Sequence, residues 1–113
     1  MLVKKAHAKK VSNSEKCTVW EYDMHNQNFN VATAYINGRF PDEGRVVNLE
    51  VEEIYYVQSG TASIHSEKGD CEIEAGDMYL FDKGEKFWVD AKELSLVVTC
   101  APAFRPEQHK HVD

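Results

Sequence analysis

The residue that most directly suggests chemistry is Glu53, near the start of the stretch EEIYYVQSG (residues 52–60). The aromatic and β-branched residues that follow it predict a strand. Because side chains alternate between the two faces of a strand, Glu53 would share one face with Tyr55 and Val57. A carboxylate buried on such an apolar face without a cation has a raised pKa, unless hydrogen-bond donors satisfy it. Glu53 is therefore a candidate catalytic acid or base.

A purely structural role for Glu53 is the alternative. Buried polar groups are normally paired, so Asn48 or a tyrosine hydroxyl could simply satisfy the carboxyl group. The large aromatic residues nearby could likewise fill a core or an interface without binding anything: Tyr55, Tyr56, Tyr79, Phe87 and Trp88. The residues alone leave both interpretations open.

Two histidines with a metal-ligand spacing, His109 and His111, lie near the C-terminus. In a strand this spacing would place both rings on one face. The segment is proline-rich, however, and no third ligand is near in sequence, so we expect a solvated tail. His65 and His25 stand alone and are expected at the surface or in hydrogen bonds. Whether His109, His111 or His65 recruits a metal stays open.

The elements that must position these residues are strands. Short runs rich in β-branched and aromatic residues alternate with turn sequences such as NG, PDEG, SG, KGD, AGD and DKGE. No run repeats apolar side chains at helical spacing over three turns. The predicted strands cover residues 18–22, 29–36, 45–50, 53–58, 61–66, 71–74, 78–82, 86–90 and 93–100. This pattern predicts an all-β fold, either a sandwich, a jelly roll or a small barrel.

Length and charge restrict the class of protein. The chain has 113 residues, which is one domain with a single core. Its net charge of −6 argues against a nucleic-acid partner, which needs clustered basic residues. The one basic cluster, KKAHAKK (residues 4–10), is expected to be a solvated tail or to guard an edge strand. No nucleotide-binding loop, G-x-S-x-G sequence or Ser-His-Asp arrangement is present.

Cysteine usage and hydropathy point to the cytoplasm. Cys17, Cys71 and Cys100 are too few and too scattered for a disulfide framework, so they are expected to be free thiols in a reducing compartment. The N-terminus has no apolar signal region, and no apolar stretch is long enough to cross a bilayer. We therefore expect a cytoplasmic protein with no membrane partner.

Two spaced motifs carry a resemblance to a known family. Glu53-x6-Gly60 is followed, after fifteen residues, by Gly76-Asp77-Met78-Tyr79-Leu80-Phe81-x-x-Gly84. This pattern resembles the two motifs of the cupin superfamily, whose members hold a divalent metal with one Glu and three His in the mouth of a double-stranded β-helix. PDEGRVVNLEVEEIYYV (residues 41–57) and CAPAFRPEQHK (residues 100–110) are similar to small single-domain cupins. The resemblance extends over about Asn30 to Lys110.

The resemblance also implies that the metal site is degenerate. Glu53 falls on the position of the metal-binding glutamate. The three histidine positions carry other residues in this chain, namely Val46 and Asn48 or Val47 and Leu49, and then Phe87. Aliphatic and phenyl groups donate no lone pair, so we expect no metal and no other cofactor.

The same resemblance implies a small-molecule pocket inside the barrel. Its predicted catalytic residue is Glu53, and its predicted ligand-binding residues are Asn48, Tyr55, Tyr79, Phe81 and Phe87. The predicted function is metal-free binding of a carbohydrate-like molecule, with isomerase or epimerase activity as the candidate reaction. The alternatives are a metal-dependent cupin enzyme with replacement ligands and a non-catalytic dimeric sensor or structural protein.

The predicted architecture is one all-β domain over residues 1–113, a double-stranded β-helix (jelly-roll) cupin barrel. Residues 1–17 would form an N-terminal arm or edge strand, and residues 101–113 an extended, irregular C-terminal tail. Large apolar side chains occupy both faces of the predicted strands, which is more than one small core needs. A homodimer is therefore expected.

Overall fold

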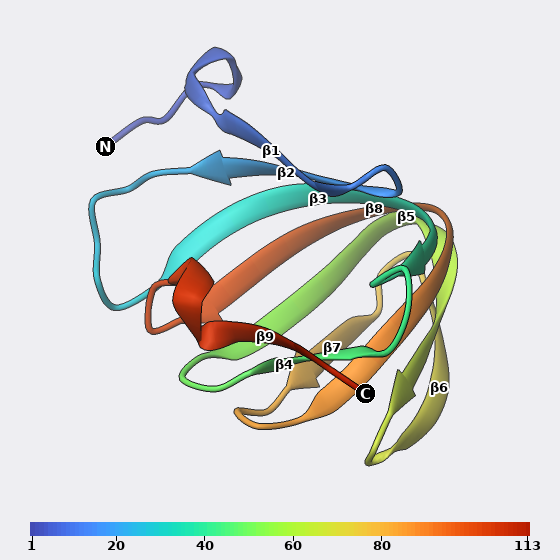
Figure 1. Cartoon of the computed structure of the whole chain (residues 1–113). Helices are drawn as coiled ribbons and strands as arrows, with labels where there is room; N and C mark the ends of the chain where they lie inside the picture. The colour runs from blue at the N-terminus through green and yellow to red at the C-terminus, as the bar shows by residue number, and fades with distance from the viewer.

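The structure, a computed structural model, describes residues 1–113 and consists almost entirely of antiparallel strands (Figure 1). The strands are β1 (Lys9–Ser14), β2 (Cys17–Tyr22), β3 (Asn30–Phe40), β4 (Arg45–Asn48), β5 (Glu52–Ser66), β6 (Gly69–Glu74), β7 (Met78–Phe81), β8 (Lys86–Ala101) and β9 (His109–Val112). Two short 3-10 turns, η1 (Lys5–His7) and η2 (Pro106–Gln108), are the only helical segments. No helix is long or apolar enough to cross a bilayer.

The two long strands β5 and β8 form the centre of the sheet. They pair with each other over most of their length. The free side of β8 pairs with β3 and β4, and the free side of β5 pairs with β6 and β7. On the β3 side the sheet continues through β2 to the edge strand β1. The sheet curls into a barrel, as Figure 1 shows, and the prediction of an all-β barrel is confirmed.

The central strands bend at Gly60, where a bulge interrupts their pairing. Gly60 has a φ of +81°, which a residue with a side chain rarely adopts. A Cβ at this position would also overlap the backbone oxygen of Glu93 on β8. Glycine is therefore required here for the two strands to curve together around the interior.

Alternation along the strands places the core inside the barrel. On β5, Tyr55 and Val57 are buried, whereas Ile54 and Tyr56 are partly exposed on the outer face. The predicted shared face of Glu53, Tyr55 and Val57 is thus confirmed. Burying these apolar faces supplies the main driving force for closing the sheet.

Both ends of the chain contribute a strand to the sheet. Within residues 1–17, the segment Lys9–Ser14 forms the edge strand β1, which pairs only with β2. Residues 101–113 are not irregular throughout, because β9 pairs with β4 from Asn48↔His109 to Arg45↔Val112. The buried side chain of Gln108 explains this order, since its backbone and amide oxygens accept hydrogen bonds from the backbone N–H groups of Leu49 and Glu50. The tail is therefore part of the barrel.

Candidate active site

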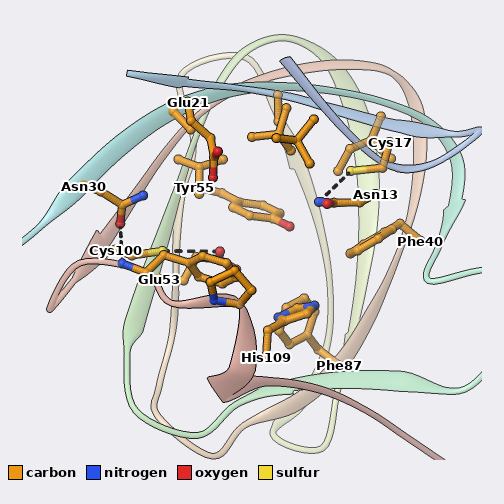
Figure 2. A pocket seen from close by; sticks show the side chains of 18 residues that line it. Asn13, Cys17, Glu21, Asn30, Phe40, Glu53, Tyr55, Phe87, Cys100 and His109 are labelled. Carbon is orange, nitrogen blue, oxygen red and sulfur yellow. Dashed lines mark hydrogen bonds between the residues drawn. The ribbon is translucent and has the colours of Figure 1, made fainter. Parts of the chain in front are cut away.

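A cavity of about 280 Å³ opens inside the barrel between the β1–β2–β3 wall and the β5–β8 wall (Figure 2). Twelve of the 18 residues that line it are hydrophobic. Ala32 and Ala34 on β3 are small inward residues that leave this space open. The C-terminal segment contributes Phe104 and Pro106, and the backbone N–H of Phe104 donates to Asn30 Oδ1 at 2.8 Å. The cavity is thus mostly apolar, with a few polar groups on its wall.

Glu53 presents its carboxyl group to this cavity (Figure 2). It has only two hydrogen-bond donors, Asn48 Nδ2 and the thiol of Cys100, each at 3.5 Å. Burial disfavours the charged form and raises the pKa of Glu53 to about 7, and these two long hydrogen bonds offset the effect only in part. Of the two predicted partners, Asn48 and a tyrosine hydroxyl, the structure has Asn48, and the rise in pKa has the predicted direction and cause.

His109 lines the same cavity. Its Nδ1 lies 3.1 Å from Asn48 Oδ1, so the same amide contacts both His109 and Glu53. Burial, together with the nearby His111, lowers the pKa of His109 to about 4. The expectation of a solvated tail was wrong for this residue, because β9 and Gln108 hold it against the barrel interior.

Tyr55 supplies a hydroxyl group to the interior of the cavity. The residue is 5% exposed and lines the cavity, yet no protein group hydrogen-bonds its hydroxyl. Every fully buried polar side-chain atom in the structure has a hydrogen-bond partner. The Tyr55 hydroxyl has none, so it is not fully buried and has accessible surface in the cavity. Burial raises the pKa of Tyr55 well above its usual value. The hydroxyl therefore stays protonated and is available to donate.

The other four predicted site residues fall in four different places. Phe87 lines the cavity, and Asn48 lies buried behind Glu53. Phe81 is not among the lining residues; its ring packs against Tyr55 and Phe87, with centroid distances of 4.8 and 3.8 Å. Tyr79 is not among them either, because its hydroxyl points to Glu85 instead. The lining residues that the sequence did not assign to the pocket include Cys17, Glu21, Phe40, Cys100, Phe104 and His109.

Among these residues, only His109 stands in a sequence pattern that indicates a role in the site. His109 is part of the C-terminal pattern CAPAFRPEQHK, which resembles the tail of small cupins. The thiols and Glu21 occupy inward positions of strands whose register is set by pairing. Nothing in their local sequence distinguishes them from ordinary strand residues.

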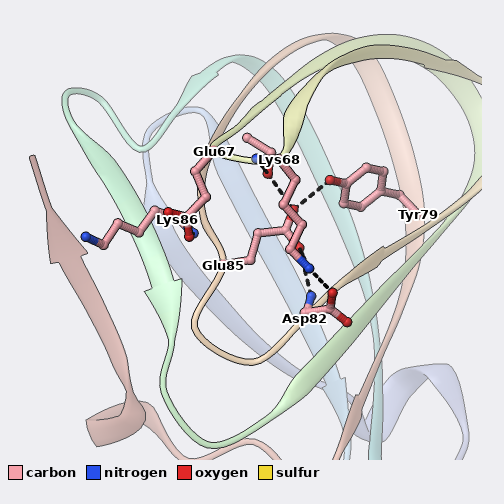
Figure 3. Close-up of polar contacts among 7 residues, drawn as sticks. Glu67, Lys68, Tyr79, Asp82, Glu85 and Lys86 are labelled. Atoms are coloured by element: carbon pink, nitrogen blue, oxygen red, sulfur yellow. Dashed lines mark hydrogen bonds and ion pairs between the residues drawn. The ribbon is translucent and has the colours of Figure 1, made fainter.

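A second buried acid, Glu85, lies outside the cavity, in the turn before β8 (Figure 3). Its carboxylate accepts hydrogen bonds from Ser66 Oγ at 2.6 Å, from the Tyr79 hydroxyl at 2.6 Å and from the backbone N–H of Asp82 at 2.9 Å. The Lys68 ammonium lies 3.9 Å away. These contacts tie the β7–β8 turn to β5.

The donor set does not fit the metal centre that the resemblance implies. No three His, Cys, Asp or Glu side chains converge anywhere in the structure. Val46 pairs directly with Phe87, and both are fully buried, so apolar groups occupy two of the expected ligand positions. Asn48 donates its amide to Glu53. A neutral amide and a carboxylate by themselves are a poor site for a transition metal.

No family model and no curated protein matches the sequence. Solved structures do match the fold. Pac13 of Streptomyces, described as a unique nucleoside dehydratase, superposes with a TM-score of 0.87 at 17% identity, over 99% of this chain and 90% of its own. The chain has a cupin fold.

Two further cupin-fold structures support this assignment. KdgF from a Halomonas species has a TM-score of 0.74 at 12% identity, over 95% of this chain and 98% of its own. Ectoine synthase from P. lautus has a TM-score of 0.75 at 17% identity, over 100% of this chain and 91% of its own. Sequence identity this low relates the folds of these cupin proteins and not their activities.

Proposed function

We propose that this cupin binds one small molecule in the barrel cavity and that Glu53 exchanges a proton with it. The observation that carries the proposal is the Glu53 carboxyl group, which faces the cavity with a pKa of about 7 and only two long hydrogen bonds. A group that changes charge near neutral pH and has spare hydrogen-bonding capacity is suited to general acid–base catalysis.

The lining indicates the kind of ligand. The apolar wall, with Phe40, Phe87 and Phe104, suits a flat ring or another hydrophobic portion. Glu53 and the Tyr55 hydroxyl suit a portion that carries hydroxyl or carbonyl oxygens. A carbohydrate-like molecule with an apolar substituent has both portions. The Streptomyces dehydratase, solved in variant forms with uridine, shows that this fold can hold a nucleoside.

The reaction class that follows is proton transfer next to a C–O group, as in an isomerase or epimerase, without a metal. The apolar residues at the expected ligand positions support the metal-free form. We predict that elemental analysis of the purified protein finds less than about 0.1 equivalent of Fe, Mn, Ni or Zn per chain. About one equivalent of any of them would favour a metalloenzyme with replacement ligands.

A binding screen with a defined variant pair tests the proposal. Uridine, fructose 6-phosphate and pyruvate are titrated into the protein by calorimetry. At least one probe is expected to bind, and Glu53→Gln is expected to weaken that binding by about 10- to 100-fold, because a hydrogen bond to a charged or polarised group is lost. Glu72→Gln is the matched control, because Glu72 also accepts a side-chain hydrogen bond, from the Ser63 hydroxyl at 2.6 Å, but on the surface. Equal effects of the two substitutions would contradict the proposal.

We also propose that two copies assemble through the outer face of β5 and β7. Four large apolar side chains are exposed there and face each other in register, Ile54 with Leu80 and Tyr56 with Met78. A second copy would cover them. Light scattering at micromolar concentration is expected to give twice the mass of one chain, and Leu80→Lys is expected to halve it. A wild-type protein that stays monomeric would refute this assembly.

Cytoplasmic localisation stays a prediction, with which the three free thiols agree.

A further inference from the structure

We propose that His109 is a second catalytic residue of this cavity, a base whose Nε2 takes a proton from the bound molecule while Glu53 donates one. The inference rests on the proposed function and makes it more specific. It starts from an observation that the function did not use, namely that one buried amide contacts both residues.

The hydrogen-bond network defines which nitrogen of His109 carries the proton. The backbone N–H of Glu50 donates to Gln108 Oε1 at 3.1 Å, so the other end of this side chain is its NH₂ group. Gln108 Nε2 therefore donates to Asn48 Oδ1 at 3.0 Å, which makes this atom of Asn48 the oxygen. An amide oxygen only accepts, so His109 Nδ1 at 3.1 Å must be the donor. The neutral ring then carries its lone pair on Nε2.

The Nε2 atom of His109 is free to act. No protein group hydrogen-bonds it. Every fully buried polar side-chain atom in the structure has a partner, so Nε2 is not fully buried and has accessible surface. The opposite end of the amide, Asn48 Nδ2, faces Glu53 Oε1 at 3.5 Å. Asn48 thus links His109 of β9 to Glu53 of β5, and both residues line the cavity, one amide apart.

The surroundings of the pair contain no permanent cation. The titratable groups that face Glu53 are Tyr55 on its own strand, Cys17 on β2 and Cys100 on β8, and Glu21 on β2 also lines the cavity. The charged group that acts on His109 is His111 on the same strand, with ring centroids 6.0 Å apart. Burial therefore favours the uncharged form of both residues, which means a protonated Glu53 and a neutral His109.

These resting forms suit a proton shift between two carbons. His109 Nε2 takes the hydrogen, as a proton, from a hydroxyl-bearing carbon next to a carbonyl group, and the electron pair of that C–H bond forms a C=C bond. The proton of Glu53 moves to the carbonyl oxygen, so the residues end as imidazolium and carboxylate with an enediol between them. Return of the imidazolium proton to the neighbouring carbon, and of a hydroxyl proton to Glu53, completes an isomerisation and restores both residues.

Acylation by diethylpyrocarbonate tests the free Nε2 without any ligand, because this reagent attacks only an accessible, unprotonated imidazole nitrogen. An ordinary imidazole, represented by N-acetylhistidine in the same tube, should react about 25-fold more slowly at pH 5 than at pH 7. The acylation rate at His109, followed by peptide mass spectrometry, is expected to stay within about 2-fold over the same range, because its pKa is about 4. A rate that falls in parallel with N-acetylhistidine, or no reaction at either pH, would overturn the proposal.

Deuterium exchange tests the catalytic role. Fructose 6-phosphate is incubated with the protein in D₂O, and NMR follows incorporation of deuterium at the carbon next to the carbonyl group. His109→Gln is expected to slow exchange by about 100-fold and to change the dissociation constant by less than about 3-fold, because the base is lost while the cavity remains. His7→Gln, at the exposed η1 turn and outside the cavity, is the matched control and should exchange like wild type.

The outcomes separate this inference from the proposed function. If Glu53→Gln weakens binding but His109→Gln exchanges normally, only the role of His109 is refuted. If fructose 6-phosphate binds and wild type does not exchange, the acid–base pair is refuted while binding stands. If no probe binds, the proposed function fails for these ligand classes, and the acylation rates still decide whether His109 has a free, unprotonated Nε2.

Discussion

Glu53 and Glu85 are two acids inside the same small barrel with opposite environments. Glu85 is 2% exposed and accepts three short hydrogen bonds from Ser66, Tyr79 and the backbone of Asp82. Glu53 has only the Asn48 amide and the Cys100 thiol, both at 3.5 Å, and faces a cavity. Glu85 is buried and Glu53 is partly buried, but only Glu85 has received short hydrogen bonds in exchange for water.

The difference between the two acids shows how a structural carboxylate can be told from a candidate catalytic one. A fully paired buried carboxylate contributes to stability because its charge is satisfied, and removal of its charge leaves the donors without a partner. An under-paired carboxylate that faces a cavity costs stability when it is charged, and its remaining lone pairs are available to a ligand. Substitution of each acid by Gln should therefore give effects of opposite sign.

The largest effect on stability is expected for Glu85→Gln. The new NH₂ group would face donors instead of accepting from them, so at least one of Ser66, Tyr79 or the Asp82 N–H loses its partner. We expect the free energy of unfolding at pH 7 to fall by about 3 to 5 kcal/mol. Denaturant titration measures this change. Probe affinity in the folded protein should be unchanged, and Glu72→Gln on the surface should change stability by less than about 0.5 kcal/mol.

A somewhat smaller effect, of opposite sign, is expected for Glu53→Gln. The pKa of Glu53 is about 7 in the folded protein and 4.5 in the unfolded chain. Above pH 7 the folded wild type must hold a buried charge, and this costs about 3 kcal/mol relative to a neutral side chain. The variant should therefore be more stable than wild type by about 2 to 3 kcal/mol at pH 8, and nearly equal to it at pH 4. A variant that is less stable at pH 8 would show that Glu53 is a structural ion like Glu85.

The sequence allowed Glu53 to be recognised as a pocket residue, but it placed His109 in a solvated tail and gave no signal for Glu85. Glu53 stands at the start of an apolar strand, where a period of two and the spacing to Gly60 define its face. Glu85 belongs to DKGEK, which has the composition of a solvated turn, and the donors that bury it come from β5 and β7. Its burial depends on tertiary contacts that no local pattern encodes.

The C-terminal segment illustrates the same limit. Two prolines predicted an irregular tail, and the proline positions are indeed outside the strands. What the pattern could not show is that Gln108 would bond to β4 and to the backbone N–H groups that follow it, and so bring His109 to the cavity. The all-β barrel could be predicted because many alternating strands agree on it. The polar pair of the site depends on one amide that joins residues about 60 positions apart in sequence.

The smallest effect is a change in the slope of the free energy of unfolding against pH. Between pH 4.5 and 6.5 the folded protein holds a proton on Glu53 and none on His109, because their pKa values are about 7 and about 4. In the unfolded chain the ordinary values, 4.5 and 6.5, reverse this arrangement. Both states then bind one proton on this pair, so the pair gives wild type no net slope of stability against pH in this window.

Removal of either partner should expose the slope of the other. In Glu53→Gln only His109 titrates. Because its pKa is lowered on folding, the unfolded state binds one more proton than the folded state, and the free energy of unfolding rises by about 1.4 kcal/mol per pH unit relative to wild type between pH 4.5 and 6.5. In His109→Gln only Glu53 titrates. Because its pKa is raised on folding, the folded state binds one more proton, and the free energy of unfolding falls by about 1.4 kcal/mol per pH unit over the same range. Denaturant titrations of wild type and both variants at several pH values measure these differences, and subtraction of the wild-type curve removes the contribution of the other acids. Slopes of the same sign in the two variants would mean that folding does not move a proton from His109 to Glu53, and the cavity would then lack its resting acid and base.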